Sequence, residues 1–243
     1  MYYNGDIVYK NISSASFPLI ITEPPQVIPS EKKCDIYDIP GMNGELVSSM
    51  MYRGNAQVRV KFALVPDGGT SAYRSALRQI LPWLSGNGEL VIGDDPDAFY
   101  EVQKVEIESD DRYVLKYGEL SVLFTVYPYQ FLESGKSWIS SPSTLQNNYD
   151  ESRPVYSLSG SGHGTLTVNT KVMTFSLNLS NSLYIDTRRM ITYDSNNNNR
   201  SQSISGDYDD LVLKSGINNI SISSSGDLSI SDFRIKPNWG IFI

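Results

Sequence analysis

The side chains that most often perform nucleophilic or metal chemistry are scarce in this chain, which has one histidine and one cysteine among 243 residues. The histidine, His163, lies in the glycine-rich segment that runs from Gly160 to Gly164. A general base needs a nucleophile beside it and a carboxylate to orient it, and Ser161 is too close along a flexible loop for that. We therefore interpret His163 as a turn residue and the glycines as a tight β-turn. The segment also lacks the strand-then-helix context of a dinucleotide-binding motif.

Two clusters of aspartates have the oxygen chemistry that calcium ions prefer. In the first, Pro96 interrupts Asp94, Asp95 and Asp97, and the spacing of an EF-hand loop is missing. A hairpin turn is therefore the favoured interpretation, and the same weighting applies to the second cluster. That cluster consists of Asp207, Asp209 and Asp210. Because one histidine and one cysteine cannot build a zinc centre, we predict no metal site, no cofactor and no catalytic residue.

The cysteine, Cys34, lacks the surroundings of a reactive thiol. Such thiols lie beside cationic groups that stabilise the thiolate, whereas Cys34 stands next to Asp35 and has Lys33 as its nearest basic neighbour. We predict a buried or edge thiol. A single cysteine also rules out a disulfide within the chain.

Aromatic side chains in the second half leave two interpretations open. They could include a platform on which sugar rings stack, or they could belong to the core or to a protein interface, the commoner role in a small β-sandwich. The residues concerned are Trp138, Tyr149, Tyr156, Tyr184, Tyr193 and Trp239.

The net charge of −7 resides in the first part of the chain. Residues 1–150 hold 12 lysines and arginines against 19 aspartates and glutamates, whereas residues 151–243 hold eight of each kind. No basic stripe is present, so we expect no specific nucleic-acid binding. The first residues lack a signal-peptide pattern, and no window approaches the roughly 18–20 apolar residues of a membrane span. We expect the chain to fold in a reducing cytosol without crossing a membrane.

The elements that would position any site are mainly strands. Val58, Val60, Phe62 and Leu64 alternate with polar or small residues, which indicates a half-buried strand. Residues 119–127 repeat the pattern, and Pro128 is expected to end it. Gly-Glu-Leu occurs three times, at 44–46, 88–90 and 118–120, where a turn should lead into a strand.

Residues 70–84 are predicted to form a helix, with Thr70 or Ser71 as its cap and Pro82 ending or kinking it. A helix of about 14 residues is marginal in water by itself. Its apolar face must therefore dock on its own sheet or on a neighbouring subunit. That face consists of Tyr73, Ala76, Leu77, Ile80, Leu81 and Leu84.

The sequence predicts two domains in an all-β fold with one short helix. Residues 1–135 form a β-sandwich-like first domain, and residues 136–153 are polar, rich in serine and asparagine, and read as a linker. Residues 154–243 contain about seven short strands separated by turn residues, which is typical of a β-sandwich. Within this second domain, residues 195–200 include four consecutive asparagines and are predicted to be an exposed, mobile loop.

The order of several motifs resembles the distal tail proteins of bacteriophages with long, non-contractile tails. These motifs are Ile-Pro-Gly-x-x-Gly-Glu-Leu at 39–46, the strand at 53–64, Leu-Pro-Trp-Leu at 81–84, Gly-Glu-Leu with Asp-Asp-Pro-x-x-x-Tyr at 88–100, and the strand ending at 128. The resemblance covers the N-terminal half best. After the linker, residues 156–160 and 216–220 and the short strands resemble the galectin-like second domain of that family.

The resemblance implies a structural hub, not an enzyme. The first domains would form a hexameric, ring-forming belt around a central channel for DNA, and the galectin-like second domains would project outward. One ring face would join the tail tube protein and the other the tail-associated lysin or fibre protein, and the outer domains would anchor receptor-binding or baseplate proteins. The protein would be a virion component of the tail tip that assembles in the host cytoplasm.

The galectin-like label does not imply sugar binding, because the galactose-binding pattern His-x-Asn-x-Arg is not met at His163. No tryptophan is followed by glutamate three residues later either. A docking platform is the favoured role of the second domain. The alternative is a carbohydrate-binding module of a phage or prophage particle that recognises the host cell surface directly.

The contacts between subunits are expected in the segment from Asp35 to Met51 and at the helix, because an exposed edge strand can pair with another chain. The predicted interface residues are Asp35, Tyr37, Met42, Glu45, Met50, Tyr52 and Arg53.

Overall fold

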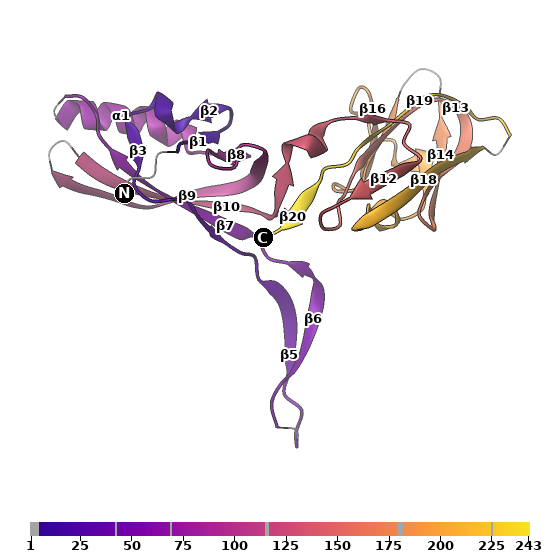
Figure 1. The fold of residues 1–243 in the computed structure, drawn as a ribbon, viewed down its shortest axis with the longest axis horizontal. Coiled ribbons are helices and arrows are strands. Elements are labelled where there is room, and N and C mark those ends of the chain that lie inside the picture. Colours follow the sequence, from indigo (N-terminus) through magenta and orange to yellow (C-terminus); the bar gives the residue numbers. More distant parts are fainter. Residues whose placement is uncertain (1–4, 42, 69, 115–116, 179–181, 225) are drawn as a thin grey trace. The chain divides into compact units, whose positions relative to one another are not determined.

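The computed structural model of the chain is mainly β-structure, with one α-helix among the residues it describes (Figure 1). These are residues 5–41, 43–68, 70–114, 117–178, 182–224 and 226–243. Contacts within the chain divide it into two compact units, one of residues 1–130 with 242–243 and one of residues 131–241. The chain therefore leaves the first unit once and returns to it, so that the second unit is an insertion in the first.

The first unit is built on a nine-stranded sheet in the order β2-β1-β8-β9-β10-β7-β3, with β4 also paired to β7 and β20 to β10. Two further strands, β5 (Lys32–Tyr37) and β6 (Leu46–Arg53), form a separate two-stranded sheet. The bounds of the others are β1 (Ile7–Tyr9), β2 (Ile12–Ser13), β3 (Leu19–Ile21), β4 (Gln26–Ile28), β7 (Ala56–Leu64), β8 (Gly88–Ile92), β9 (Ala98–Val114), β10 (Tyr117–Leu132) and β20 (Gly240–Phe242).

Strands β7 and β10 confirm the alternation that predicted them. Every second residue of β7, from Ala56 to Leu64, is buried. The strand pairs with β10 in an antiparallel register that sets Val126 opposite Ala56 and Gly118 opposite Leu64. Opposite residues in a sheet project from the same face, so the two strands together supply one continuous apolar surface to the core.

Pro128 does not end β10, and that prediction was wrong. The strand continues to Leu132, and the carbonyl of Pro128 accepts a hydrogen bond from the backbone N–H of Ile243 at 3.1 Å. Proline lacks a donor but keeps its acceptor, so it is tolerated in a strand where the neighbour needs only the carbonyl.

Helix α1 (Thr70–Trp83) lies on the apolar side of this sheet (Figure 1). Of the two predicted docking surfaces, the helix therefore packs on the sheet of its own chain. Tyr73, Ala76 and Ile80 are buried in the same core as β7 and β10. Leu81 is 44% exposed, so its predicted place on the apolar face was wrong. Trp83 is buried in its stead and donates its indole N–H to the carbonyl of Tyr9 at 3.0 Å.

The second unit has two layers that share one long strand. The first part of β13 (Val155–Val168) pairs with β19 and β15, and its later part pairs with β14 and β18. The remaining strands are β11 (Ile139–Ser140), β12 (Thr144–Asn147), β14 (Lys171–Leu177), β15 (Leu183–Asp186), β16 (Ile191–Asp194), β17 (Ile204–Ser205), β18 (Gly216–Ser224) and β19 (Ser229–Lys236). Short 3-10 helices, η1 (Ser14–Ser16) in the first unit and η2 (Glu133–Lys136), η3 (Ser201–Ser203) and η4 (Tyr208–Leu211) in the second, complete the described elements.

The glycines around His163 lie in strand β13, so the prediction of a tight turn was wrong. The register with β19 shifts between Ser159 and Gly160, at the point where β13 passes from one layer to the other. Gly160 and Gly162 have φ of +148° and +96°, and a Cβ on either would press against backbone atoms of the segment 227–230. These glycines permit a bent strand that another chain segment crosses closely.

The segment predicted as a linker, residues 136–153, contains two strands of the second unit. Ile139 and Ser140 of β11 pair with Ile235 and Arg234, and β12 pairs along its whole length with β18. Short edge strands rich in serine and asparagine lack the apolar alternation by which a strand is recognised. In the structure the second unit begins at Phe131.

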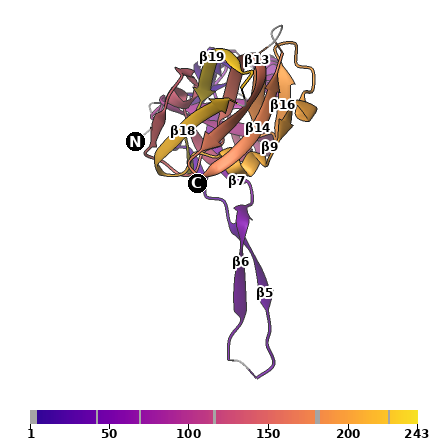
Figure 2. The same ribbon diagram turned by 90° about the vertical axis from the view of Figure 1, so that its right-hand side faces the viewer.

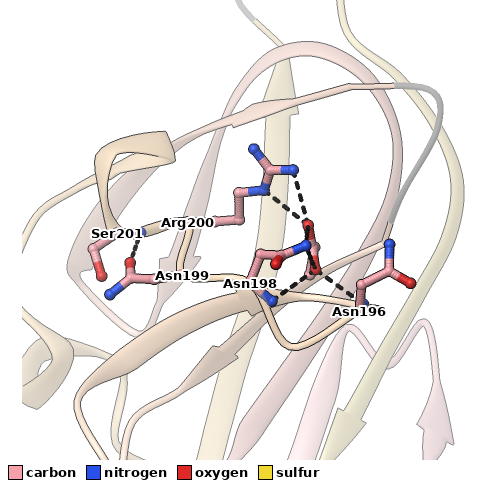
Figure 3. A network of polar contacts seen from close by, with 6 residues as sticks. Asn196, Asn198, Asn199, Arg200 and Ser201 are labelled. Atoms are coloured by element: carbon pink, nitrogen blue, oxygen red, sulfur yellow. Dashed lines mark hydrogen bonds and ion pairs between the residues drawn. The ribbon is translucent and has the colours of Figure 1, made fainter.

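Asp194 fixes the asparagine-rich loop that was predicted to be mobile (Figure 3). Its side chain is 2% exposed and accepts hydrogen bonds from the backbone N–H groups of Asn196 (2.9 Å) and Asn198 (3.0 Å). The guanidinium of Arg200 approaches the same carboxylate at 2.8 Å. Burial would raise the pKa of Asp194, but these hydrogen bonds outweigh it and lower the pKa from 3.8 to about 2. The loop is exposed, as predicted, yet anchored.

Replacing Gly162 by alanine should destabilise the second unit through its contact with the crossing backbone. The matched control is Gly226→Ala, because Gly226 also has a positive φ (+112°) but has open space around its Cβ position. A left-handed conformation costs a non-glycine residue about 1–2 kcal/mol, so the control should lose about that much. Gly162→Ala should lose clearly more in urea unfolding, and equal losses would contradict the close crossing.

Asp194→Asn should lower the thermal midpoint at pH 7 by removing the charge on which the loop is anchored. The pKa of Asp194 is lower in the folded chain than in the unfolded one, so its stabilisation is fully present above about pH 4. It is lost as the pH falls through about 2. The difference between wild type and variant should therefore shrink between these two values. A difference that is independent of pH, or one matched by Asp67→Asn in the first unit, would contradict the assignment.

Candidate assembly surface

Strands β5 and β6 and the loop between them, residues 32–53, form a ribbon that we call the arm. It protrudes from the sheet of the first unit (Figure 1 and Figure 2). Every residue of β5 is exposed. The arm pairs Tyr37 with Leu46 and Ile36 with Val47, and the register shifts between Lys32 and Cys34.

Apolar cross-strand pairs lie on both faces of the arm. Successive residues of a strand point to opposite faces, so the Ile36–Val47 pair occupies one face and the Tyr37–Leu46 pair the other. The exposed fractions of these four side chains are 58%, 58%, 51% and 46% in that order. An arm that folded back onto its own sheet could cover one face at most.

A two-stranded ribbon of this kind is only marginally stable in water. Complete burial of a large apolar side chain contributes about 1.5–3 kcal/mol, so covering the exposed half of each of the four would add about 1 kcal/mol per residue. The arm therefore has the properties of a contact surface that another polypeptide covers.

The root of the arm is held by Phe242, which returns from the second unit. The ring of Phe242 stacks on the ring of Tyr129, with centroids 4.3 Å apart. The guanidinium of Arg53 lies over the ring of Phe242, 4.9 Å from its centroid, and makes a cation–π contact. The backbone N–H of Ser30 donates to the carbonyl of Ile243 at 2.9 Å. Arg53, at the end of β6, and Ser30, two residues before β5, are thus fixed to β10 through residues 242 and 243.

An open hollow of about 650 Å³ lies beside this root. Residues on both sides line it, and the charged ones are two acidic and two basic residues, Glu31, Lys32, Lys33 and Asp35, with Ile28 of β4 and Gln57 of β7 opposite the arm. The hollow is therefore bounded partly by the arm and partly by the sheet. Cys34 is exposed there, in a strand of a two-stranded sheet. Of the two predicted positions, an edge thiol therefore agrees with the structure and a buried thiol does not.

The structure places the predicted interface residues along the arm. Asp35 and Tyr37 are exposed on β5, and Glu45 is exposed immediately before β6. Arg53 is half-buried at the root, where it contacts Phe242. Met50 and Tyr52 lie in β6, and Met42 lies outside the described residues. That these residues contact another subunit stays a prediction.

The remaining candidates for chemistry are engaged in local structure. His163 is exposed on β13, with its Nδ1 2.8 Å from the carboxylate of Asp227. Its hydrogen bonds hold the pKa of Asp227 below the usual range. Both side chains are more than half exposed, so the pair is a surface ion pair whenever the histidine is protonated.

The aspartate clusters serve as turns, caps and ion pairs. Residues 93–97 form the predicted turn between β8 and β9, in which Asp95 N–H donates to the carbonyl of Ile92 at 2.9 Å. Asp207 caps η4 by accepting from the N–H of Asp209 at 3.0 Å, and Asp210 pairs with Lys171 at 2.8 Å. Within the described residues, no three histidine, cysteine, aspartate or glutamate side chains are grouped so as to hold a metal ion.

The aromatic residues of the second unit divide between core and surface. Tyr156, Trp239 and Tyr149 pack in or against the core. Trp138, Tyr184 and Tyr193 instead form a row, with Tyr184 and Tyr193 stacked at 5.3 Å between centroids and Trp138 6.3 Å from Tyr184. Trp138 is 41% exposed. The core role is therefore confirmed for Tyr156, Trp239 and Tyr149, and a sugar-stacking role for the other three stays a prediction.

In the described part of the chain, α1 is too short and too polar to cross a bilayer, and no other helix there meets the requirement.

The fold of the chain is shared with a solved structure over nearly the whole length of both. No protein-family model matches the chain, and no curated protein does. Among solved structures, the chain is similar to the Dit (gp 19.1) protein of phage SPP1, described as a paradigm of the hub adsorption apparatus in phages that infect Gram-positive bacteria. The match has a TM-score of 0.70 and covers 96% of this chain and 97% of that one, at 12% sequence identity. The expected all-β distal-tail fold is confirmed.

Phe242→Ala should loosen the root of the arm, because it removes the stacking on Tyr129 and the contact with Arg53. Aromatic stacking and an exposed cation–π contact contribute about 0.5–1.5 and 0.5–1 kcal/mol, so we expect a loss of about 1–2.5 kcal/mol in unfolding free energy. Trypsin should also cleave faster after Lys32, Lys33 and Arg53. Phe242→Tyr keeps the ring and should behave like wild type. Unchanged cleavage in Phe242→Ala would show that the root is held by other contacts.

Proposed function

We propose that this chain is a structural hub of the tail tip or baseplate of a phage with a long, non-contractile tail. The observation that carries the proposal is the fold shared over nearly the whole chain with the SPP1 hub protein. The arm adds independent support, because a ribbon that is apolar on both faces suits a protein that acts by assembling.

In this proposal the first units assemble as a hexameric ring, with each arm covered by a neighbouring copy. Head-to-tail contacts between identical subunits generate closed rings when the rotation closes. One face of the ring joins the tail tube protein and the other the tail-associated lysin or fibre protein. The second units lie outside and anchor receptor-binding or baseplate proteins. The protein functions in the virion after assembly in the host cytoplasm.

The acidic excess of residues 1–150, most of which belong to the first unit, fits a channel through which DNA passes. Residues 1–150 carry all of the net charge of −7. If part of this excess lines the channel, like-charge repulsion keeps the DNA from adhering to the wall. A structure of the assembled ring tests this directly, and a neutral or basic lumen would contradict it.

A structural, non-enzymatic function is supported by the contacts that the candidate histidine and aspartates make within the chain. The histidine and the aspartates singled out from the sequence form ion pairs, caps and turns. None of these roles requires a substrate. The proposal therefore includes no catalytic residue, cofactor or metal.

Carbohydrate recognition is the second candidate function, and the aromatic row of the second unit favours it. Trp138, Tyr184 and Tyr193 offer flat apolar surfaces that could stack on sugar rings. On a glycan array, Trp138→Ala should abolish binding if the row is a sugar site. Tyr127→Ala, an exposed aromatic of the first unit, is the control. Absence of binding by wild type would reject this candidate and leave the hub proposal intact.

The proposed self-assembly predicts that a charge on the apolar arm prevents it. Val47→Asp should weaken association at least about tenfold, which corresponds to about 1.4 kcal/mol, while the monomer keeps its thermal stability because Val47 is 58% exposed. Val172→Asp is a matched control, since Val172 is also an exposed strand residue (49%) but lies in the second unit. Light scattering over a concentration series gives the mass. A wild type that stays at the mass of one chain, with its natural neighbours present, would overturn the proposal.

A further inference from the structure

The tetrapeptide Asn-Gly-Glu-Leu occurs twice in the first unit, at 43–46 and at 87–90. Glycine after asparagine makes it easy for the backbone to approach the asparagine side chain, since glycine has no Cβ in the way. The two asparagines therefore have a similar intrinsic reactivity, and any large difference between them in the folded chain must come from the structure. A third Asn-Gly pair, at 4–5, begins outside the described residues.

The reaction that this dipeptide permits is the loss of ammonia from the side chain. The backbone nitrogen of the glycine attacks the side-chain carbonyl carbon of the asparagine, its proton passes to the leaving amino group, and ammonia departs. The attack requires a backbone that can bring the reacting atoms to about 3–3.5 Å. Water then opens the five-membered imide by adding its hydroxyl to one carbonyl carbon and its proton to the nitrogen. The product is aspartate or isoaspartate, and water is the only co-reactant.

Asn43 and Gly44 lie in the turn of the arm, between the end of β5 at Tyr37 and the start of β6 at Leu46. Both residues of the dipeptide are exposed. Gly44 has a φ of +94°, and nothing lies within 4 Å of the position of a Cβ there. The described residues make no hydrogen bond or ion pair with the side chain of Asn43. This turn therefore leaves both reacting groups free to approach each other.

The second copy of the tetrapeptide has a different environment. Asn87 is exposed like Asn43, but Gly88 is the first residue of β8 and lies opposite Val102 of β9. A Cβ on Gly88 would lie 2.6 Å from Cγ of Lys10. The attacking backbone nitrogen thus belongs to a paired strand that a neighbouring side chain crosses closely.

The turn that leads into β8 is also held from the side of β1. The hydroxyl of Tyr9 donates a hydrogen bond to the carbonyl of Gly86. The ammonium group of Lys10 donates another to the carbonyl of Ser85. A backbone fixed on both sides of Asn87 cannot rotate readily to the geometry of attack.

We propose that Asn43 is a site of spontaneous deamidation in the folded chain, and that the fold protects Asn87 despite the identical sequence that follows it. The reaction adds a carboxylate to residues 34–52, which hold three acidic side chains and no basic one. This inference goes beyond the proposed function and does not require that copies of the chain assemble.

Mass spectrometry of tryptic peptides tests the two sites separately. Asn43 is the only asparagine of the peptide 34–53, and Asn87 is the only one of the peptide 79–104. The full chain is incubated in a mildly alkaline buffer, in which the attacking nitrogen loses its proton more readily, and is sampled over time. Deamidation adds the mass difference between a hydroxyl and an amino group. Asn43 should react at least about tenfold faster than Asn87, a difference in barrier of about 1.4 kcal/mol.

The same chain unfolded in guanidinium chloride is the matched control. Without the fold, both asparagines precede the same three residues and should react at similar rates. A preference for Asn43 that persists undiminished in the unfolded chain would show that local sequence sets it, and this would overturn the structural assignment. Equal rates in the folded chain, or reaction of Asn87 before Asn43, would overturn it too.

The variant Asn43→Gln identifies the reacting side chain. Its extra methylene would require a six-membered ring, so the peptide 34–53 of the aged variant should keep its mass. Isoaspartate methyltransferase should label this peptide in aged wild type and not in the variant. A mass gain that remains in the variant would place the reaction at another residue and contradict the proposal. These measurements use the dissociated chain, so the hub function stands or falls independently of them.

Discussion

One constraint governs how the arm can be covered: a two-stranded ribbon that is apolar on both faces cannot bury both of them against the sheet of its own chain. The pairs Ile36–Val47 and Tyr37–Leu46 fix this, because the register of the arm sends them to opposite faces. Removing apolar surface from water is the main driving force for association. In the proposed assembly, this part of the sequence would lose its unfavourable exposure.

The rest of the first unit provides a rigid base for that ribbon. Helix α1 and the central strands β7 and β10 share one core, so the sheet to which the arm is connected is well packed. Phe242 then joins the arm root to β10 through Tyr129 and Arg53. A fixed root limits the directions in which the arm can point, and pre-organisation of this kind reduces the entropy lost on binding.

Much of the fold could be predicted from local patterns, because period-two alternation marks β7 and β10 and a single apolar face marks α1. The order of turn motifs also pointed to the fold that the chain shares with the solved SPP1 structure. The crossing of β13 between layers could not be predicted, since Gly160 and Gly162 look like turn residues until the segment that crosses them is known. Likewise, the anchoring of the loop on Asp194 depends on backbone donors that only the folded chain brings together. The arm residues were singled out from sequence, but their two-sided exposure was not, because an exposed strand and a buried one can have the same composition.

Hydrogen–deuterium exchange of the arm amides tests the central claim most directly. The exchange rates of residues 32–37 and 46–53 would be compared between the dissociated chain and its assembly, with β7 as an internal reference for a strand protected in both states. We expect fast exchange in the arm of the dissociated chain and strong protection upon assembly. Equal exchange in the two states would mean that the arm stays uncovered, and this would contradict the account.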